Sequence, residues 1–186
     1  MVMVRLTNPP NELLSLFSES QRKFYSDYSE YVYSQLSRDD VQQFIHKVVT
    51  EEDIDLFKVE EIRIMRFPFG TSGAELEHAK RKKIDIEHGT YFGHCILALK
   101  RIDIYPPKFN SDLTKNTAAK QFWDEEEMRY YFFCYEPVKT LLHELLHIKY
   151  KEDENTVKRL SKKYMIYFER ETKGEIKYSL KKTSFI

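Results

Sequence analysis

The feature that most constrains the fold is the stretch VKTLLHELLHIKY, which follows Pro137 without a helix-breaking residue. Proline is well tolerated in the first turn of a helix, because the amide proton that it lacks has no partner there. The two leucines between the histidines can face a hydrophobic core. The sequence therefore predicts a helix that begins near Pro137 and carries two histidines and a glutamate among its leucines.

These polar residues are His143, Glu144 and His147, in the pattern HExxH. Helical residues four positions apart lie one above the other, so both imidazoles can reach one tetrahedral Zn²⁺. Glu144 would then lie beside the remaining coordination position, where a carboxylate can accept a proton from an activated water and pass it to a leaving amine. Without such a role, each of these buried polar groups would need another partner. The sequence predicts a zinc site with His143 and His147 as ligands and Glu144 as general base.

A catalytic zinc needs a third protein ligand. On a straight helix Glu154 would lie about 10 Å beyond His147 along the axis, so the chain must turn between them. Asp153 and Glu154 are the two candidates, and Glu154 is favoured because Asp153 is also a natural N-cap for the next helix. Glu169 and Glu171 are more distant alternatives.

The remaining pattern predicts an α+β fold. Helical spacing of apolar and aromatic residues predicts helices at 12–16, at 19–36 and from Asp39 or Asp40 onward. Strands are predicted at 59–68, 79–87 and 94–105, which together suggest a small, mainly antiparallel sheet. Further helices are expected from residue 117, at the HExxH stretch and at 154–168, followed by a strand at 175–180.

A length of 186 residues favours a single domain, 1–186, with a helical N-terminal part (1–58) and a sheet with the HExxH helices (59–186). Lys plus Arg and Asp plus Glu both number 30, so no overall basic field attracts nucleic acid or anionic lipid. Apolar runs are too short for a membrane helix, and no signal-peptide pattern precedes them. We expect a soluble cytoplasmic protein in which Cys95 and Cys134 are buried thiols.

The other histidines are weaker candidates for a functional role. His88 and His94 flank a glycine-containing loop, HGTYFGH, where they would either form a second metal site, line a cleft, or be hydrogen-bonding surface residues. The last alternative is favoured, and His46 and His78 are expected to be ordinary surface groups.

The segment TLLHELLHIKY resembles the active-site helix of zincin metallopeptidases. Over about residues 94–168, the order of elements is similar to compact SprT-like and WLM-type peptidase domains and to small metallopeptidases of archaea and their viruses. The resemblance implies a zincin-like fold and zinc-dependent hydrolysis of a peptide or protein substrate. It also implies that the strand RIDIYPP lines the cleft, where an extended peptide adds as a further strand.

The chain departs from related families at three points. Where metzincins and WLM-type domains place a third histidine, six residues after the second, this chain has Asp153. Tyr150 stands where metzincins have glycine, and no zinc-ribbon cysteines follow the predicted domain. Membership of the metzincins is therefore not expected.

Three hypotheses follow from the motif. The first is an active zinc peptidase. The second is a binding or regulatory module with a zincin-type fold, acting in a host–virus or toxin-type system. The third is a structural domain in which HExxH arose by chance. Bound zinc would exclude the third hypothesis, and loss of hydrolysis in a zinc-retaining Glu144→Gln protein would separate the first from the second.

Overall fold

The computed structural model describes residues 5–7, 15–83, 92–108 and 130–182, except for the side chains of residues 132 and 173–182. The described residues form five α-helices and a four-stranded sheet, which confirms the α+β class. The helices are α1 (Glu19–Leu36), α2 (Asp39–Glu51), α3 (Gly73–Lys82), α6 (Glu136–Tyr150) and α7 (Glu154–Lys182). The strands are β1 (Arg5–Thr7), β2 (Glu61–Ile64), β3 (Gly93–Ile96) and β4 (Arg101–Ile104).

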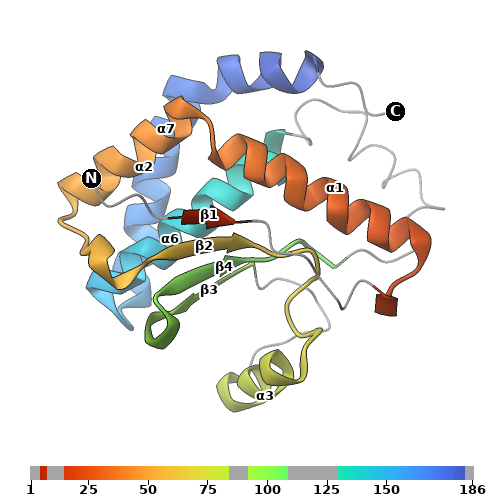
Figure 1. The fold of residues 1–186 in the computed structure, drawn as a ribbon. Helices are drawn as coiled ribbons and strands as arrows, with labels where there is room; N and C mark the ends of the chain where they lie inside the picture. The colour runs from red at the N-terminus through yellow and green to blue at the C-terminus, as the bar shows by residue number, and fades with distance from the viewer. Residues whose placement is uncertain (1–4, 8–14, 84–91, 109–129, 183–186) are drawn as a thin grey trace.

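The sheet has the strand order β1-β2-β4-β3 and is mixed (Figure 1). β1, β2 and β4 run parallel, and only β3 is antiparallel to its neighbour β4. The prediction of a mainly antiparallel sheet is therefore wrong. Parallel neighbours are joined by crossover connections, so their pairing depends on contacts between distant segments that local alternation does not reveal. The three-residue strand β1 was not predicted.

The predicted strand at 79–87 is also wrong over its described part, because residues 79–82 form the last turn of α3. Ser72 and Glu75 close a capping box at the start of this helix, in which the Ser72 hydroxyl accepts from the Glu75 amide and the Glu75 side chain accepts from the Ser72 amide. Glu75 also accepts a bond from the amide of Gly70 at 3.0 Å. Residues 84–87 lie outside the described residues.

The segment predicted as one strand at 94–105 forms two strands that double back on each other. A 3₁₀ turn at Leu97–Leu99 and a left-handed Lys100, with φ 48°, reverse the chain between β3 and β4. A positive φ is uncommon in residues other than glycine, so nothing in the local composition marks this turn. As a result β3 forms one edge of the sheet and β4 lies inside it.

The helix predictions hold better. Both α1 and α2 are confirmed, with Tyr28, Val32 and Leu36 buried on one stripe of α1. Pro137 lies in the first turn of α6 as predicted, directly after a π-helical turn at Tyr131–Tyr135. The helix α7 begins where predicted but continues to Lys182, so the predicted strand at 175–180 is wrong. The predicted helix at 12–16 lies mostly outside the described residues, as does the predicted start at 117.

The core lies between the sheet and the helices that surround α6. Helix α6 contacts α1, α2, α7, β3 and β4, and it buries four leucines in this core. From the sheet, Ile62 and Ile64 of β2 and their neighbours on β4 point into the same cluster. A smaller cluster, which includes Phe69, Ala79 and Tyr105, packs α3 against the other part of the fold. Because α6 is central, the residues on its remaining face are held in fixed positions.

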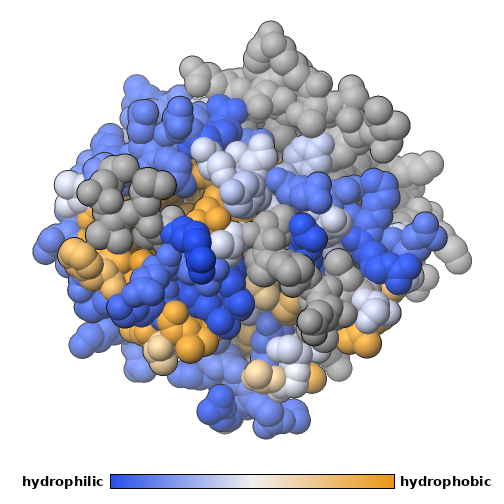
Figure 2. All heavy atoms as spheres, viewed as in Figure 1, coloured by the Kyte–Doolittle hydropathy of each residue, from blue (hydrophilic) through white to orange (hydrophobic). Residues whose placement is uncertain are grey.

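Polar side chains cover most of the described surface seen in Figure 2, with separate hydrophobic patches between them. None of the helices in the described part of the chain has the length and apolar character that crossing a membrane requires. Both cysteines are free thiols. Cys134 is buried, as predicted, whereas Cys95 is only half-buried because it lines the cleft. The cytoplasmic location stays a prediction.

Candidate metal centre

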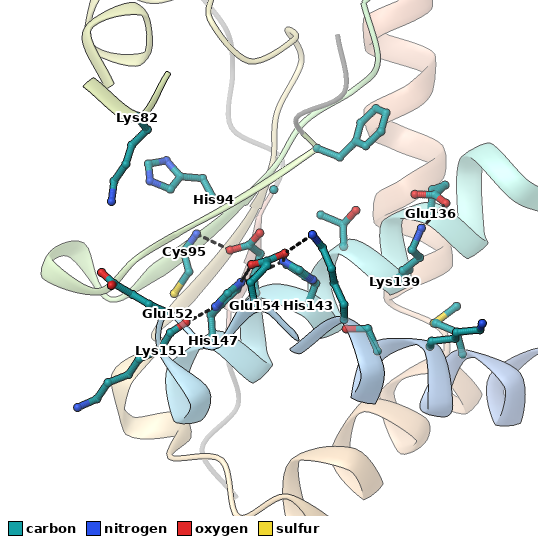
Figure 3. Close-up of a pocket in the computed structure, with 18 of the residues that line it drawn as sticks. Lys82, His94, Cys95, Glu136, Lys139, His143, His147, Lys151, Glu152 and Glu154 are labelled. Atoms are coloured by element: carbon teal, nitrogen blue, oxygen red, sulfur yellow. Dashed lines mark hydrogen bonds and ion pairs between the residues drawn. The ribbon is translucent and has the colours of Figure 1, made fainter. Parts of the chain in front are cut away.

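The HExxH residues lie on the face of α6 opposite its buried leucines, where α7 returns alongside (Figure 3). Leu145 and Leu146, between the two histidines, are 1% and 0% exposed, so they fix the rotation of α6 about its axis. The chain then reverses over residues 151–153, and α7 begins at Glu154. This reversal brings the Glu154 carboxylate back to the two imidazoles.

The three side chains point at a common position. His143 Nε2 and His147 Nε2 are 3.0 Å apart. Glu154 Oε2 lies 3.2 Å from His147 Nε2, and Glu154 Oε1 lies 3.6 Å from His143 Nε2. A tetrahedral zinc with bonds of 2.0–2.1 Å would separate its ligand atoms by about 3.3 Å. The observed spacings surround this value, and two histidines with one glutamate are a known donor set of catalytic zinc. The side chains therefore fit the metal that the sequence predicts.

The other candidates for third ligand lie elsewhere. The carboxylate of Asp153 accepts a bond from the backbone amide of Thr156 at 3.1 Å and so caps the start of α7. The group of metal-competent residues found among the described residues contains Glu154 and not Asp153. Glu169 and Glu171 lie about four turns further along α7. The favoured candidate is thus the one that meets the histidines, while zinc binding itself stays a prediction.

The second nitrogen of His147 is fixed by the turn after α6. His147 Nδ1 lies within hydrogen-bonding distance of the Lys151 carbonyl oxygen. A carbonyl can only accept, so the proton belongs on Nδ1, and the lone pair of Nε2 is free for a metal. Lys151 adopts φ 52° and ψ −116°, a conformation outside the helix in which its carbonyl points toward the ring. Burial, followed by the nearby His147, lowers the pKa of His143, which favours the neutral imidazole that a metal requires.

Helix α2 holds this turn in place. The Tyr150 hydroxyl donates to the Glu52 carboxylate at 2.6 Å, and the Tyr164 hydroxyl donates to the same carboxylate. The Lys149 ammonium donates to the backbone carbonyl of Glu52. These contacts join the end of α6, the first turns of α7 and the end of α2. The position of Glu154 relative to the histidines therefore depends on the N-terminal helices.

Glu144 has the environment of a general base. Its Oε2 accepts a hydrogen bond from the backbone amide of Cys95, on β3, at 2.9 Å. Burial raises the pKa of Glu144 to about 7, against the opposing effects of His147 and of the Cys95 amide. A carboxylate with this pKa can exchange protons in both directions near neutral pH. The sequence did not predict the Cys95 contact, since it joins residues on different elements.

Gly93 allows β3 to approach α6 closely enough for that contact. A Cβ at this position would lie 2.5 Å from Thr140 Cγ2 and 2.9 Å from Glu144 Oε1. Glycine inside a strand often marks such a close backbone approach, and this was the signal in the sequence that could have indicated it.

Replacing Gly93 by alanine should therefore separate β3 from α6. We expect Gly93→Ala to reduce the free energy of unfolding by about 1–3 kcal/mol, as overpacking typically does. Urea unfolding of the purified protein measures this loss. Gly73→Ala is the matched control, because a Cβ there meets nothing within 4 Å. Equal stability of the two variants would contradict the close approach.

A cleft of about 1250 Å³ extends from the three side chains across β3 to the end of α3. Phe92, Gly93, His94 and Cys95 line it, whereas RIDIYPP, which the resemblance placed there, forms the inner strand β4. The cleft strand is thus β3. The hairpin explains the difference, because it puts the residues before Lys100 on the edge.

The remaining histidines divide between the cleft and the surface. His94 lines the cleft. Of the three alternatives for this histidine, the position in a cleft is therefore the one observed, and the favoured surface position is not. His78 also lines the cleft, with its ring centroid 4.3 Å from that of His94, and is not the ordinary surface residue that was expected. His46 is exposed, as predicted. His88 lies outside the described residues.

Comparisons with models of known protein families, with curated proteins and with solved structures found no match. The functional argument therefore rests on the geometry of this site.

Proposed function

We propose that this chain is a zinc-dependent peptidase of the HExxH type, with a zincin-like arrangement of its site. His143, His147 and Glu154 would be the zinc ligands, and Glu144 would be the general base. The observation that supports this most is that the three ligand atoms lie within 4.8 Å of one another, in a cleft that Glu144 also lines. A purely structural role would not require this convergence of polar groups.

Each residue has a distinct role in the proposed reaction. Zinc, when bound, would polarise the scissile carbonyl and lower the pKa of the attacking water. Glu144 accepts the proton of that water and transfers it to the departing amine nitrogen. The Cys95 amide keeps the Glu144 carboxylate aimed at the site, and the Lys151 carbonyl keeps His147 in the required tautomer.

The free edge of β3 supports a peptide or protein substrate. The Tyr105 amide donates to the Phe92 carbonyl at 2.9 Å, so Phe92 faces β4. Along an antiparallel strand, the backbone N–H and C=O groups of successive residues point alternately toward and away from the neighbouring strand. The backbone groups of Gly93 and Cys95 therefore face away from β4. The Cys95 amide is bound to Glu144, and Gly93 is buried beside Thr140 and Glu144. This leaves the Cys95 carbonyl as the group on this edge that an extended peptide could meet. No strand covers this edge within the described residues.

The cellular setting is part of the same proposal. Cys95 and Cys134 are free thiols, which suits a reducing compartment. We place the reaction in the cytoplasm on this basis.

Metal analysis combined with a hydrolysis assay tests the proposal. We expect about one zinc per chain, and cleavage of an unfolded casein substrate that stops after removal of zinc by a chelator and returns when zinc is added back. The His143→Ala protein should lack both zinc and activity. Zinc binding without hydrolysis would favour the regulatory-module hypothesis, and a folded protein that binds no zinc would overturn the metal site.

A further inference from the structure

Two lysines follow Glu154 along the wall of the cleft that α7 forms. Lys158 and Lys162 come one and two turns after Glu154, and both line the cleft. At 1.5 Å per residue they lie about 6 and 12 Å from Glu154 along the helix axis. Lys158 Nζ is 3.2 Å from Glu154 Oε1, so this lysine reaches the edge of the candidate metal centre. Figure 3 labels three further lysines that line the cleft, Lys82, Lys139 and Lys151, of which Lys151 points away from the two histidines.

The cleft has a surplus of positive charge. Glu144 and Glu154 serve the proposed centre, and Glu136 is paired with Lys139 at 3.0 Å. Among the described residues that line the cleft, this leaves a single further carboxylate, that of Glu152. The charged residues that line the cleft are Lys82, Lys139, Lys151, Lys158, Lys162, Glu136, Glu144, Glu152 and Glu154. A zinc ion would add to the surplus, although the whole chain has a formal net charge of zero.

Binding of zinc would also change the partner of Lys158. In the described structure this ammonium pairs with Glu154. A divalent cation would bind the same Glu154 carboxylate and repel the Lys158 ammonium, which would weaken the ion pair between Lys158 and Glu154. Lys162 has no carboxylate within 4 Å in the part of the chain that the structure describes. Both lysines are then available to a negatively charged group on a substrate.

We propose that the cleft selects peptides that carry a carboxylate two to four residues from the scissile bond, held by Lys158 and Lys162. This inference rests on the proposed peptidase function. An extended peptide advances about 3.3 Å per residue, so for a peptide that runs along the α7 wall of the cleft, 6 and 12 Å correspond to about two and four residues. Charges gathered in a cleft raise the local concentration of oppositely charged ligands. The carboxylate comes either from an acidic side chain or from the C-terminus of the peptide.

Matched peptides test the preference and separate its two sources. Capped peptides Ala-Ala-Ala-Ala-Phe-Ala-Ala-Ala-Ala would carry Glu or Gln two, three or four residues from the central Phe-Ala bond, on either side. A second set would keep Gln and compare a free C-terminal carboxylate with an amide. Two exposed ion pairs predict kcat/KM about five- to tenfold higher for the charged member of a pair at low salt, decreasing as salt is added.

Variants of α7 assign the preference to these lysines. Lys162→Gln should reduce the Glu-to-Gln ratio about threefold, and Lys162→Glu should bring it below one. Lys163→Gln is the matched control on the same helix, since its Nζ lies 4.7 Å from the centroid of the Tyr164 ring and it does not line the cleft. Its ratio should equal that of the wild type. An unchanged ratio in Lys162→Glu would overturn the assignment.

A binding measurement distinguishes failure of this inference from failure of the peptidase function. Fluorescence anisotropy of labelled Glu and Gln peptides with zinc-loaded Glu144→Gln protein reports selection without hydrolysis. Equal affinities and equal kcat/KM for both peptides would overturn the preference and leave the peptidase intact. Tighter binding of the Glu peptide by a protein whose wild type hydrolyses neither would overturn the peptidase function and support the charge selection.

Discussion

The Glu144→Gln protein is expected to bind zinc as the wild type does and to hydrolyse peptides about 10³-fold more slowly, within the range typical of lost general acid–base catalysis. Glutamine has nearly the same shape and can still occupy the space beside His143 and His147. It cannot accept a proton from water, and it has none to return to the amine. Steady-state kinetics together with metal analysis of the same preparation measures both quantities.

Glu144 is not among the residues whose ligand atoms converge, so its substitution should change hydrolysis without changing zinc content. A variant that loses zinc along with activity would mean that Glu144 has a structural role at the site. A variant that retains most of its activity would show that another group accepts the proton. The Gly73→Ala protein, altered at a residue that does not line the cleft, serves as a control for preparation and handling.

Glu154→Ala is expected to change the zinc content of the protein, whereas Asp153→Ala is expected to change its stability. Glu154→Ala should lose bound zinc on dialysis and with it all measurable hydrolysis, because the two histidines alone leave the metal without a charged ligand. Asp153→Ala should retain zinc but lower the free energy of unfolding by about 1 kcal/mol, as expected for a lost N-cap. Metal analysis after dialysis and urea unfolding separate the two effects.

Retention of stoichiometric zinc by Glu154→Ala would move the third ligand elsewhere. The conservative variant Glu154→Gln adds a further comparison, since it keeps the length of the side chain and removes only its charge. We expect it to bind zinc more weakly than the wild type, and more tightly than Glu154→Ala. Loss of zinc from Asp153→Ala instead would assign the ligand to the capping residue.

The sequence predicted the part of the site that lies within one helix. The four-residue interval between His143 and His147 determines their relative position, because helical geometry is the same in any fold. Glu154 was favoured for a local reason as well, since Asp153 was expected to cap α7 and does. Local sequence patterns were therefore sufficient to predict which three residues converge.

Two of the wrong predictions, the single strand at 94–105 and the strand at 79–87, concern local structure. The turn between β3 and β4 contains no glycine, asparagine or proline, and its left-handed residue is Lys100, so the hairpin was taken for one strand. By contrast, Ser72 and Glu75 have the sequence spacing of a capping box, which predicts the start of a helix. This pattern was overlooked, and a strand was predicted there instead. The first error had no signal to correct it, whereas the second did.

The parallel pairing of β1, β2 and β4 and the contact between Cys95 and Glu144 could not be predicted. Each depends on how distant segments meet, which helical or strand periodicity does not encode. The same holds for the lysines of the cleft, since Lys82 and Lys162 are adjacent to one cavity only in the folded chain.

The proposed ligand residues and the proposed general base differ in how far apart in the sequence their supporting contacts lie. His143, His147 and Glu154 belong to one helix–turn–helix segment, so only a short loop must close to assemble them. The bond that orients Glu144 joins residues 49 positions apart and exists only when the sheet is docked. A partly unfolded molecule with α2, α6 and α7 packed together and the sheet undocked would keep the proposed metal site and have no catalytic activity. Metal content would then overestimate the active fraction of a preparation, and only titration with a tight inhibitor would count competent molecules.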